Sequence, residues 1–405
     1  MKTLTSCCFF LLYLCLFQPC HALPTWTFHG KVADGRQFDA VTGPDNKRVH
    51  LISSAYYQFA SDGRRLVVEN VGDEKQGSLD FPPALAVDPA GNVHVITRHG
   101  TSGASTGFDI RYRMRNADGG WSDDFYVGAR EARNYVVGIA APATGSVYHH
   151  YTKAGDNVWG DVRIWQKNNA FSSGLLGNIG GIWRADTDAR MRGLGNKVFL
   201  VSGKCDGSGK TYFTHCTTGS NCFNELAANI RTHTAGNYRK GSPDLYVDKN
   251  GHVHITYGSQ FEVYYNRYDH RQQPVFAQDK RIFSGLGSWH LQFGLSAVAA
   301  SDDGSVVVAV ALDPDGSKEA SNSDLLWNYS LDGGASWADP MRLDAVTDGG
   351  EGRCRPRLVM VDDTFFLFFR DNASQGITLA SLPLNSLVAS AAPVMSPVHH
   401  LLLGK

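Results

Sequence analysis

The stretch LAVDPAGNVHVIT (85–97) decides the fold, because its pattern returns along the whole chain. It contains an apolar run, an Asp/Gly turn and a second apolar run. LYVDKNGHVHITYG (245–258) repeats it nearly residue for residue. Such a pattern is typical of two antiparallel strands joined by a tight turn.

Five more copies share this shape: VTGPDNKRVHLIS (41–53), IAAPATGSVYHHY (139–151), RGLGNKVFLVSG (192–203), VAASDDGSVVVAV (298–310) and LVMVDDTFFLFFRD (358–371). Their turns lie about 45 to 60 residues apart, which leaves room for four strands in each unit. A second hairpin with alternating aromatic residues follows most copies, as in EVYYNRYDHR (262–271). The sequence therefore predicts an all-β, seven-bladed β-propeller of four-stranded antiparallel blades.

Residues 23–385 are predicted to form one propeller domain. We expect the ring to close by pairing an N-terminal strand near residues 26–32 with the last blade around residues 377–383, because closure removes exposed sheet edges. The stretch from Ser330 to Trp337 matches the Asp-box pattern S-x-D-x-G-x-x-W. In that turn the aspartate caps backbone amides, which is a structural role. Residues 386–405 are expected to be a small-residue tail with little to bury.

Residues 1–22 have the pattern of a cleaved secretory signal, with a lysine at position 2, an apolar run and small residues at the end. A secreted protein is therefore expected. The cysteines outside this segment are Cys205, Cys216, Cys222 and Cys354. An even, sparse set in an exported protein favours one or two disulfides. A structural zinc at Cys205, Cys216 and Cys222 is the alternative, and a structural calcium is also open.

The charge of the chain is nearly balanced, with 38 Lys and Arg against 39 Asp and Glu. This balance argues against a nucleic-acid or membrane-surface binder. No stretch beyond residue 22 reaches the roughly 20 apolar residues of a membrane span. We expect a monomer, in which an anionic partner is bound by a local cluster of basic side chains.

The hairpin repeat predicts where such a cluster lies. Residues that precede the first strand of a hairpin and residues that follow the second emerge on the same face. Arginine is abundant at these places, and it can bind a carboxylate such as that of a uronic acid through two parallel hydrogen bonds. The candidate substrate-binding residues are Asp80, Arg98, Lys153, Arg190, Arg239, Arg353 and Arg355.

The histidines divide by the same repeat. His94 and His254 occupy identical places in their hairpins, and His50 lies close to that place, so we expect these three to have packing roles. His149 and His150 are unique to their unit and alternate along one strand, so only one of them can point inward. The candidate catalytic residues are Tyr135, His99 and His150.

The stretch from Asp80 to His94, together with His99, resembles the seven-bladed propeller polysaccharide lyases, the group of ulvan lyases and related enzymes that cleave next to glucuronate. In that family a His precedes a P-A-x-x-x-D-x-x-G-x-x-H strand pair and a second His ends it. A catalytic Tyr opens the next blade, and an Arg closes the second strand of that blade. His99 and Tyr135 match the second His and the Tyr. Asp80 replaces the first His, and Thr152–Lys153 replace the Arg.

The resemblance implies a polysaccharide lyase acting on a uronide by β-elimination. Tyr135 would be the base, or a base and acid in turn, with His99 as its partner. Arg239, or Arg353 with Arg355, would bind the carboxylate. This chemistry requires no cofactor, and the implied partner is an anionic polysaccharide.

Two other classes of function stay open. A sialidase-like glycoside hydrolase would share the Asp-box and the arginines, but it would need six blades, an arginine motif near the N-terminus and suitable acidic residues. A noncatalytic glycan-binding propeller is the other, because a fold does not fix its function.

Overall fold

The structure is a computed structural model of the 405-residue chain. It describes residues 23–35, 37–71, 83–99, 108–123, 125–131, 137–143, 146–154, 160–167, 173–178, 189–203, 210–219, 222, 225–226, 229, 231–234, 243–258, 261–287, 296–314, 323–343, 356–371, 374 and 376–391. Within these ranges no helix is long and apolar enough to cross a membrane.

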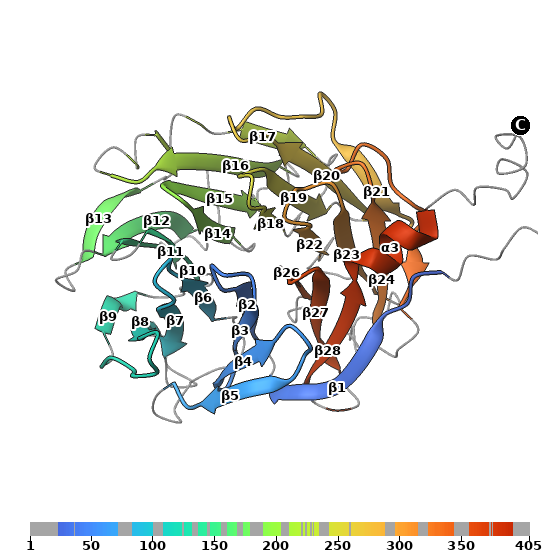
Figure 1. The fold of residues 1–405 in the computed structure, drawn as a ribbon. Coiled ribbons are helices and arrows are strands. Elements are labelled where there is room, and N and C mark those ends of the chain that lie inside the picture. Colours follow the sequence, from blue (N-terminus) through green and yellow to red (C-terminus); the bar gives the residue numbers. More distant parts are fainter. Residues whose placement is uncertain are drawn as a thin grey trace, which may run out of the picture.

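The described chain forms four-stranded antiparallel sheets, and these number seven. Figure 1 shows them arranged around a common centre. The innermost strands contact one another in the closed order β2, β6, β10, β14, β18, β22, β26 and back to β2. An all-β propeller with four-stranded antiparallel blades, as the repeats predicted, is thereby confirmed.

Blades one to six take their strands in chain order from the centre outward, and blade seven does so for three strands and adds the N-terminal β1 as its fourth. The two inner strands of blades one to seven are β2 (Asp39–Thr42) and β3 (Arg48–Ile52), β6 (Ala84–Val87) and β7 (Val93–His99), β10 (Val137–Ala143) and β11 (Ser146–Ala154), β14 (Ala189–Leu194) and β15 (Lys197–Gly203), β18 (Asp244–Val247) and β19 (Val253–Gly258), β22 (Ser296–Ala300) and β23 (Val307–Pro314), and β26 (Arg357–Val361) and β27 (Thr364–Asp371).

The two outer strands, in the same blade order, are β4 (Tyr56–Ala60) and β5 (Arg65–Glu69), β8 (Phe108–Arg115) and β9 (Phe125–Glu131), β12 (Gly160–Lys167) and β13 (Ser173–Asn178), β16 (Lys210–Thr217) and β17 (Arg231–Thr234), β20 (Glu262–Tyr268) and β21 (Lys280–Ser284), β24 (Ser323–Ser330) and β25 (Met341–Arg342), and β28 (Gly376–Pro383) and β1 (Thr27–Asp34).

The N-terminal strand closes the ring as predicted. β1 pairs antiparallel with β28, from Thr27 opposite Ser381 to Asp34 opposite Gly376. The seventh blade therefore joins both ends of the domain, and the outer edge of β28 is covered.

The hydrophobic core lies between neighbouring blades. Phe366 and Phe368 of blade seven pack with Leu51 and Phe59 of blade one, and all four side chains are fully buried. Burying such a side chain contributes about 1.5 to 3 kcal/mol. Each blade is thus fixed by the two beside it, and the ring positions residues that are far apart in sequence.

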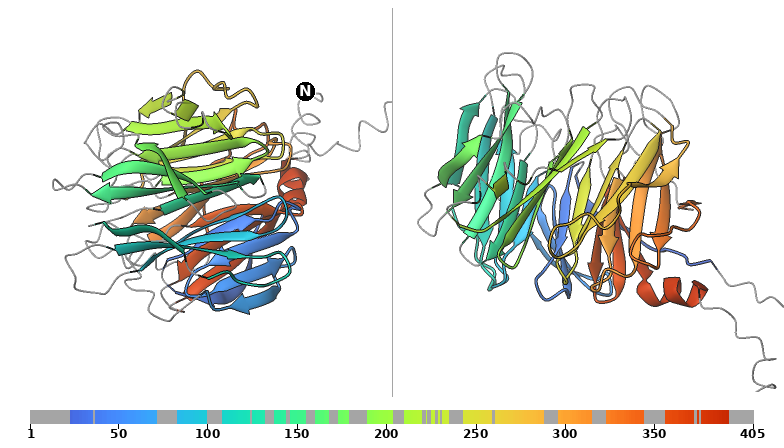
Figure 2. Two further views of the ribbon diagram at one scale, coloured as in Figure 1. Left: turned by 90° about the vertical axis from the view of Figure 1, so that its left-hand side faces the viewer. Right: turned by 90° about the horizontal axis from the view of Figure 1, so that it is seen from above.

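The C-terminal segment differs from the expected tail. Residues Leu384–Ala391 form helix α3, at one edge of the disc (Figure 2). Leu387 is fully buried in a cluster that includes Trp26 and Trp327, and the backbone N–H of Leu384 donates to the carbonyl of Asp363 at 2.8 Å. The apolar residues of this segment cover the core, so the ordered domain extends to residue 391.

The turn at Ser330–Trp337 is held by its own polar groups. Asp332 Oδ1 accepts from the backbone N–H of Ser336 at 2.8 Å, so the predicted amide capping is present. The ring of Trp337 lies 5.0 Å from that of Tyr265 in blade five. The turn therefore links two blades.

The disc has two faces, which we name for the rest of the description. The turn face carries the tight turns between the two inner strands of each blade. The strand-start face is opposite, where the innermost strands begin and the second strands end.

Candidate functional site

Five charged residues meet at the centre of the ring, near the strand-start face. Asp39, Asp244 and Arg357 are the first residues of β2, β18 and β26, and Arg190 and Arg192 are the second and fourth residues of β14. We call these five residues the axial cluster. Blades one, four, five and seven each supply at least one member, so only ring closure brings the cluster together.

Asp39 is the hub of the axial cluster. Its Oδ1 accepts from Arg357 Nε at 2.9 Å and from Arg190 Nη1 at 3.4 Å, and it lies 3.7 Å from Arg192 Nη2. Its Oδ2 accepts from the backbone N–H of Leu85 in blade two at 3.3 Å. Asp39 is fully buried, and these cationic and amide partners offset the cost of removing its carboxylate from water.

The other half of the cluster is less well paired. Arg190 Nε lies 3.5 Å from Asp244 Oδ1, and among the described residues neither atom makes a hydrogen bond. Arg190 Nη2 also has none there. Burial raises the pKa of Asp244, while the nearby arginines oppose that shift. Two nitrogens of Arg190 and one oxygen of Asp244 are therefore buried without a hydrogen bond to any described residue.

His150 lies beside Arg190. It is fully buried, and neither of its ring nitrogens has a hydrogen-bond partner among the described residues. Its ring fills the space above Gly138, where an added Cβ would stand 2.0 Å from Cε1. Burial, and then the charge of Arg190, lower the pKa of His150 to about 3, so the ring is neutral.

The structure brings together two of the predicted site residues, His150 and Arg190. His149 is also buried, so burial does not separate the two neighbouring histidines. Arg190 is 4% exposed and faces both aspartates of the axial cluster. Its direct contact with substrate stays a prediction, whereas its position makes it a member of the buried axial cluster.

Other predicted residues are described only by their backbone. Arg98 and His99 are the last two residues of β7, and Lys153 is next to last in β11. Both strand ends lie at the strand-start face, in neighbouring blades. Tyr135, Asp80, Arg239, Arg353 and Arg355 lie outside the described residues, so their roles stay predictions.

The repeated histidines have packing roles, as predicted. His94 Nδ1 lies 2.7 Å from the Tyr112 hydroxyl, and its Nε2 lies 3.3 Å from Asp88 Oδ2. His254 repeats this with Tyr265 at 2.8 Å and Asp248 at 3.3 Å.

The third repeated histidine keeps half of this arrangement. His50 Nδ1 lies 2.7 Å from the hydroxyl of Tyr56. The histidine thus joins the second strand of a blade to its third strand, and in blades two and five it also joins the turn aspartate.

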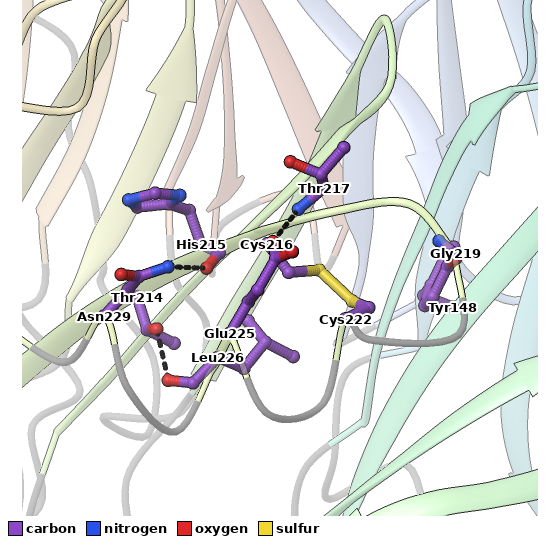
Figure 3. The surroundings of a disulfide bond; sticks show 10 residues. All are labelled: Tyr148, Thr214, His215, Cys216, Thr217, Gly219, Cys222, Glu225, Leu226 and Asn229. Carbon is purple, nitrogen blue, oxygen red and sulfur yellow. Dashed lines mark hydrogen bonds between the residues drawn. A yellow bond between two sulfur atoms is a disulfide. The ribbon is translucent and has the colours of Figure 1, made fainter.

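The cysteine prediction is resolved in part. Cys216 of β16 and Cys222 form a disulfide (Figure 3). This disulfide leaves neither Cys216 nor Cys222 as a free thiolate, so it argues against the zinc alternative at Cys205, Cys216 and Cys222. Cys205 and Cys354 lie outside the described residues. In the part of the chain that is described, no group of His, Cys, Asp and Glu could hold a metal ion.

Sequence reasoning missed Asp39, Asp244, Arg192 and Arg357. A signal was available for the two aspartates. Each lies four residues before the first turn residue of its hairpin, where other blades have Ala84 and Ala297. The equivalent position is Arg190 in blade four and Arg357 in blade seven, so charged residues of both signs recur at a buried place of the repeat, which indicates an interaction between blades.

No protein-family model and no curated protein matches the sequence. Among solved structures, an ulvan lyase of polysaccharide lyase family PL25, bound to -[GlcA(1-4)Rha3S]-, is similar with a TM-score of 0.52 and 11% identity, over 88% of this chain and 96% of that one. The BP39L lectin of Burkholderia pseudomallei is similar with a TM-score of 0.57 and 8% identity, over 87% and 97%.

A GH74 xyloglucanase of Xanthomonas campestris is also similar, with a TM-score of 0.52 and 13% identity, over 89% of this chain and 54% of that one. Because a lyase, a lectin and a hydrolase are all similar at such low identity, the comparisons show the fold alone. The comparisons agree with the geometry that the chain is a β-propeller.

Proposed function

We propose that this protein is an exported polysaccharide lyase that cleaves a uronic-acid-containing, ulvan-like polysaccharide by β-elimination. The observation that supports the proposal is topological. Consecutive blades bring the end of β7, with Arg98 and His99, the end of β11, with Lys153, and the start of β14 to one face. A polysaccharide lyase bound to a glucuronate-containing glycan has a similar fold.

The reaction needs three kinds of group. A base removes the C5 proton of the uronide, an acid protonates the departing O4, and a cation stabilises the carboxylate as negative charge develops on it. The C4–O4 bond breaks while a C4–C5 double bond forms. We assign Tyr135 as base, or base and acid in turn, with His99 as its partner. No cofactor is needed for these steps.

The carboxylate binders are assigned to Arg239 and to Arg353 with Arg355. Arginine suits this task because its guanidinium stays charged and matches a carboxylate with two parallel donors. Arg190 and His150 lie in and beside the buried axial cluster, and we assign them a positioning role beneath the strand-start face. Arg190 is already opposite Asp39 and Asp244, so we expect it to position neighbouring groups and not to contact the sugar.

The assay uses ulvan, glucuronan and other uronides with the purified protein, and follows the ultraviolet absorbance of the unsaturated uronate. Product formation is expected on at least one of them. Flat traces on the whole panel, with reducing ends released from another glycan, would support the hydrolase class. Binding of a glycan without any turnover would support the lectin class, which the similarity to BP39L makes the second candidate.

The Tyr135→Phe variant tests the assigned base. Removing a general base or acid lowers the rate by about 10²-fold to 10⁴-fold, so activity should fall by at least that lower factor. Tyr329→Phe is the matched control, because Tyr329 lies near the end of β24 toward the turn face. Undiminished turnover in Tyr135→Phe would move the base to another residue.

A further inference from the structure

A cavity of about 190 Å³ runs along the axis of the ring. Its wall is formed by the innermost strands. Arg192, Asp244 and Arg357 line one end, and Asn46, Lys249 and Asp302 line the other end at the turn face. The cavity therefore leads from the turn face down to the axial cluster.

The wall between these ends is apolar and made partly of small residues. Ala40, Ala86 and Ala141 line it together with Leu245 and Val359. The alanines leave the space open, and the surface between the charged ends offers few hydrogen-bonding groups. Such a wall favours an apolar body over a sugar, whose hydroxyls would lose their hydrogen bonds to water.

The charge at the floor is not balanced. The axial cluster has three arginines against two aspartates, a formal charge of +1 among the described residues, and His150 beside it is neutral. Arg192 is the most exposed of the three arginines, at 21% of its side chain, and it lines the cavity. All three arginines share Asp39 as an ion-pair partner, so positive charge is left in excess and this floor favours an anion.

The size of the cavity limits the ligand. A cavity of about 150 Å³ holds a benzene molecule. A cavity of about 190 Å³ therefore suits a ligand of roughly benzoate size and is too small for an oligosaccharide. The cavity is thus a different site from the one proposed for the polysaccharide.

A polar contact across three blades lies at the turn-face end. Asn46 Nδ2 of blade one donates to Asp302 Oδ1 of blade six at 3.0 Å, and Lys249 of blade five forms an ion pair with Asp302. Asp302 and Lys249 are 40% and 53% exposed. Opening this contact requires no movement of the core, so a small ligand can enter from the turn face.

We propose that the axial cavity is a second binding site, which takes a small organic monocarboxylate with an apolar body. The carboxylate faces Arg192 at the floor, and the apolar body contacts the alanine-lined wall. This site goes beyond the proposed lyase function and does not depend on it.

The test is a calorimetric titration of the full chain with benzoate and hexanoate, with benzamide, acetate and chloride as matched probes. The two larger carboxylates should bind, and benzamide should not. Binding of chloride or acetate as tight as that of benzoate would overturn the apolar half of the proposal. Absence of heat and of a thermal shift with either larger carboxylate would overturn the site itself.

Two kinds of variant test separately the positive charge at the floor of the cavity and the volume that the ligand occupies. Arg192→Gln should weaken benzoate binding by about tenfold to a hundredfold, the range for a lost hydrogen bond to a charged group. Ala86 lines the cavity and also packs in the core between blades two and three, so Ala86→Leu adds volume at both without changing any charge, and it should abolish binding. Urea denaturation of Ala86→Leu shows whether the fold is kept, and Leu194→Trp, at a partly exposed residue of the same wall, is the second blocking variant. Arg64→Gln is the control, since Arg64 is 72% exposed on an outer hairpin. Benzoate binding that is unchanged in Ala86→Leu would place the ligand elsewhere.

The polysaccharide assay on the same preparations keeps the two proposals apart. Ala86→Leu should retain turnover of the uronide while losing benzoate. If no polysaccharide is cleaved but benzoate binds as described, the lyase function fails and the axial site stands. If the polysaccharide is cleaved but benzoate does not bind, the lyase function stands and the axial site fails.

Discussion

Two regions of the molecule bury histidine, and they treat it differently. In the hairpins of blades two and five, both ring nitrogens of His94 and His254 lie within 3.3 Å of a tyrosine hydroxyl or an aspartate. At the axis, His150 is buried as deeply, but its nitrogens lack hydrogen-bond partners among the described residues. His254 has hydrogen-bond partners at both ring nitrogens and His94 has one at Nδ1, with Asp88 in ion-pair contact at its Nε2, whereas His150 has a partner at neither nitrogen among the described residues.

The hairpin histidines also show how hydrogen bonds within one blade offset the desolvation cost of burying an imidazole ring. Burial lowers the pKa of His254, although Asp248 opposes that shift, so the ring is neutral. A carboxylate only accepts, so Nε2 donates to Asp248, and the Tyr265 hydroxyl then donates to Nδ1. Every partner comes from the same blade. The axial cluster, in contrast, needs four blades, and it ends with one positive charge in excess.

The largest loss of stability is expected for a substitution of Asp39, the hub of the axial cluster. Asp39→Asn removes the carboxylate that faces Arg357, Arg190 and Arg192, and it leaves buried guanidinium groups uncompensated. The free energy of unfolding should fall by about 3 to 5 kcal/mol, as for other broken buried pairs. Denaturation in urea measures it.

The control for the hub is Asp62→Asn. Asp62 pairs with Arg64 at 3.7 Å, and both side chains are more than half exposed. The change should stay within about 0.5 kcal/mol. Equal losses for the two aspartates would show that the axial cluster contributes nothing special to stability.

The second effect compares the two kinds of histidine directly. His94→Leu leaves the Tyr112 hydroxyl and Asp88 without this partner, and should cost about 2 to 3 kcal/mol. His150→Leu removes no hydrogen bond within the described chain and should cost under about 1 kcal/mol. Urea denaturation at pH 7 measures both. A loss for His150→Leu as large as that for His94→Leu would mean that the His150 ring has a partner.

The smallest expected change is in the pH dependence of the unfolding free energy, to which His150 contributes. His150 has a pKa of about 3 in the folded state, against 6.5 when unfolded. The unfolded chain therefore binds a proton that the folded chain does not, so stability falls as the pH drops from 6.5 toward 3. Between pH 7 and pH 5 this histidine alone should remove about 2 kcal/mol.

The measurement is the unfolding free energy of the wild type and of His150→Leu at both pH values. Burial also lowers the pKa of His50, to about 4, and that contribution has the same sign. His50 is present in both proteins, so it cancels in the comparison. Wild type and variant should lose different amounts on acidification, and equal losses would show that His150 titrates normally.

Much of the fold could be predicted from the sequence. The hairpin repeat gave the four-stranded blades, because alternation of apolar residues and an Asp/Gly turn are local properties. Ring closure by β1 and β28 followed from the need to cover a sheet edge. The helix α3 was missed because its short, small-residue sequence shows no strong periodicity, and burial of Leu387 stabilises it only in the folded protein.

The sequence by itself determined the repeating unit and the packing roles of His50, His94 and His254, since each unit carries its own partners nearby. Only the tertiary structure decided the axial cluster. Asp39 meets Arg190 across 151 residues and Arg357 across 318 residues. Contacts of that range depend on closing the ring, and no local pattern encodes them.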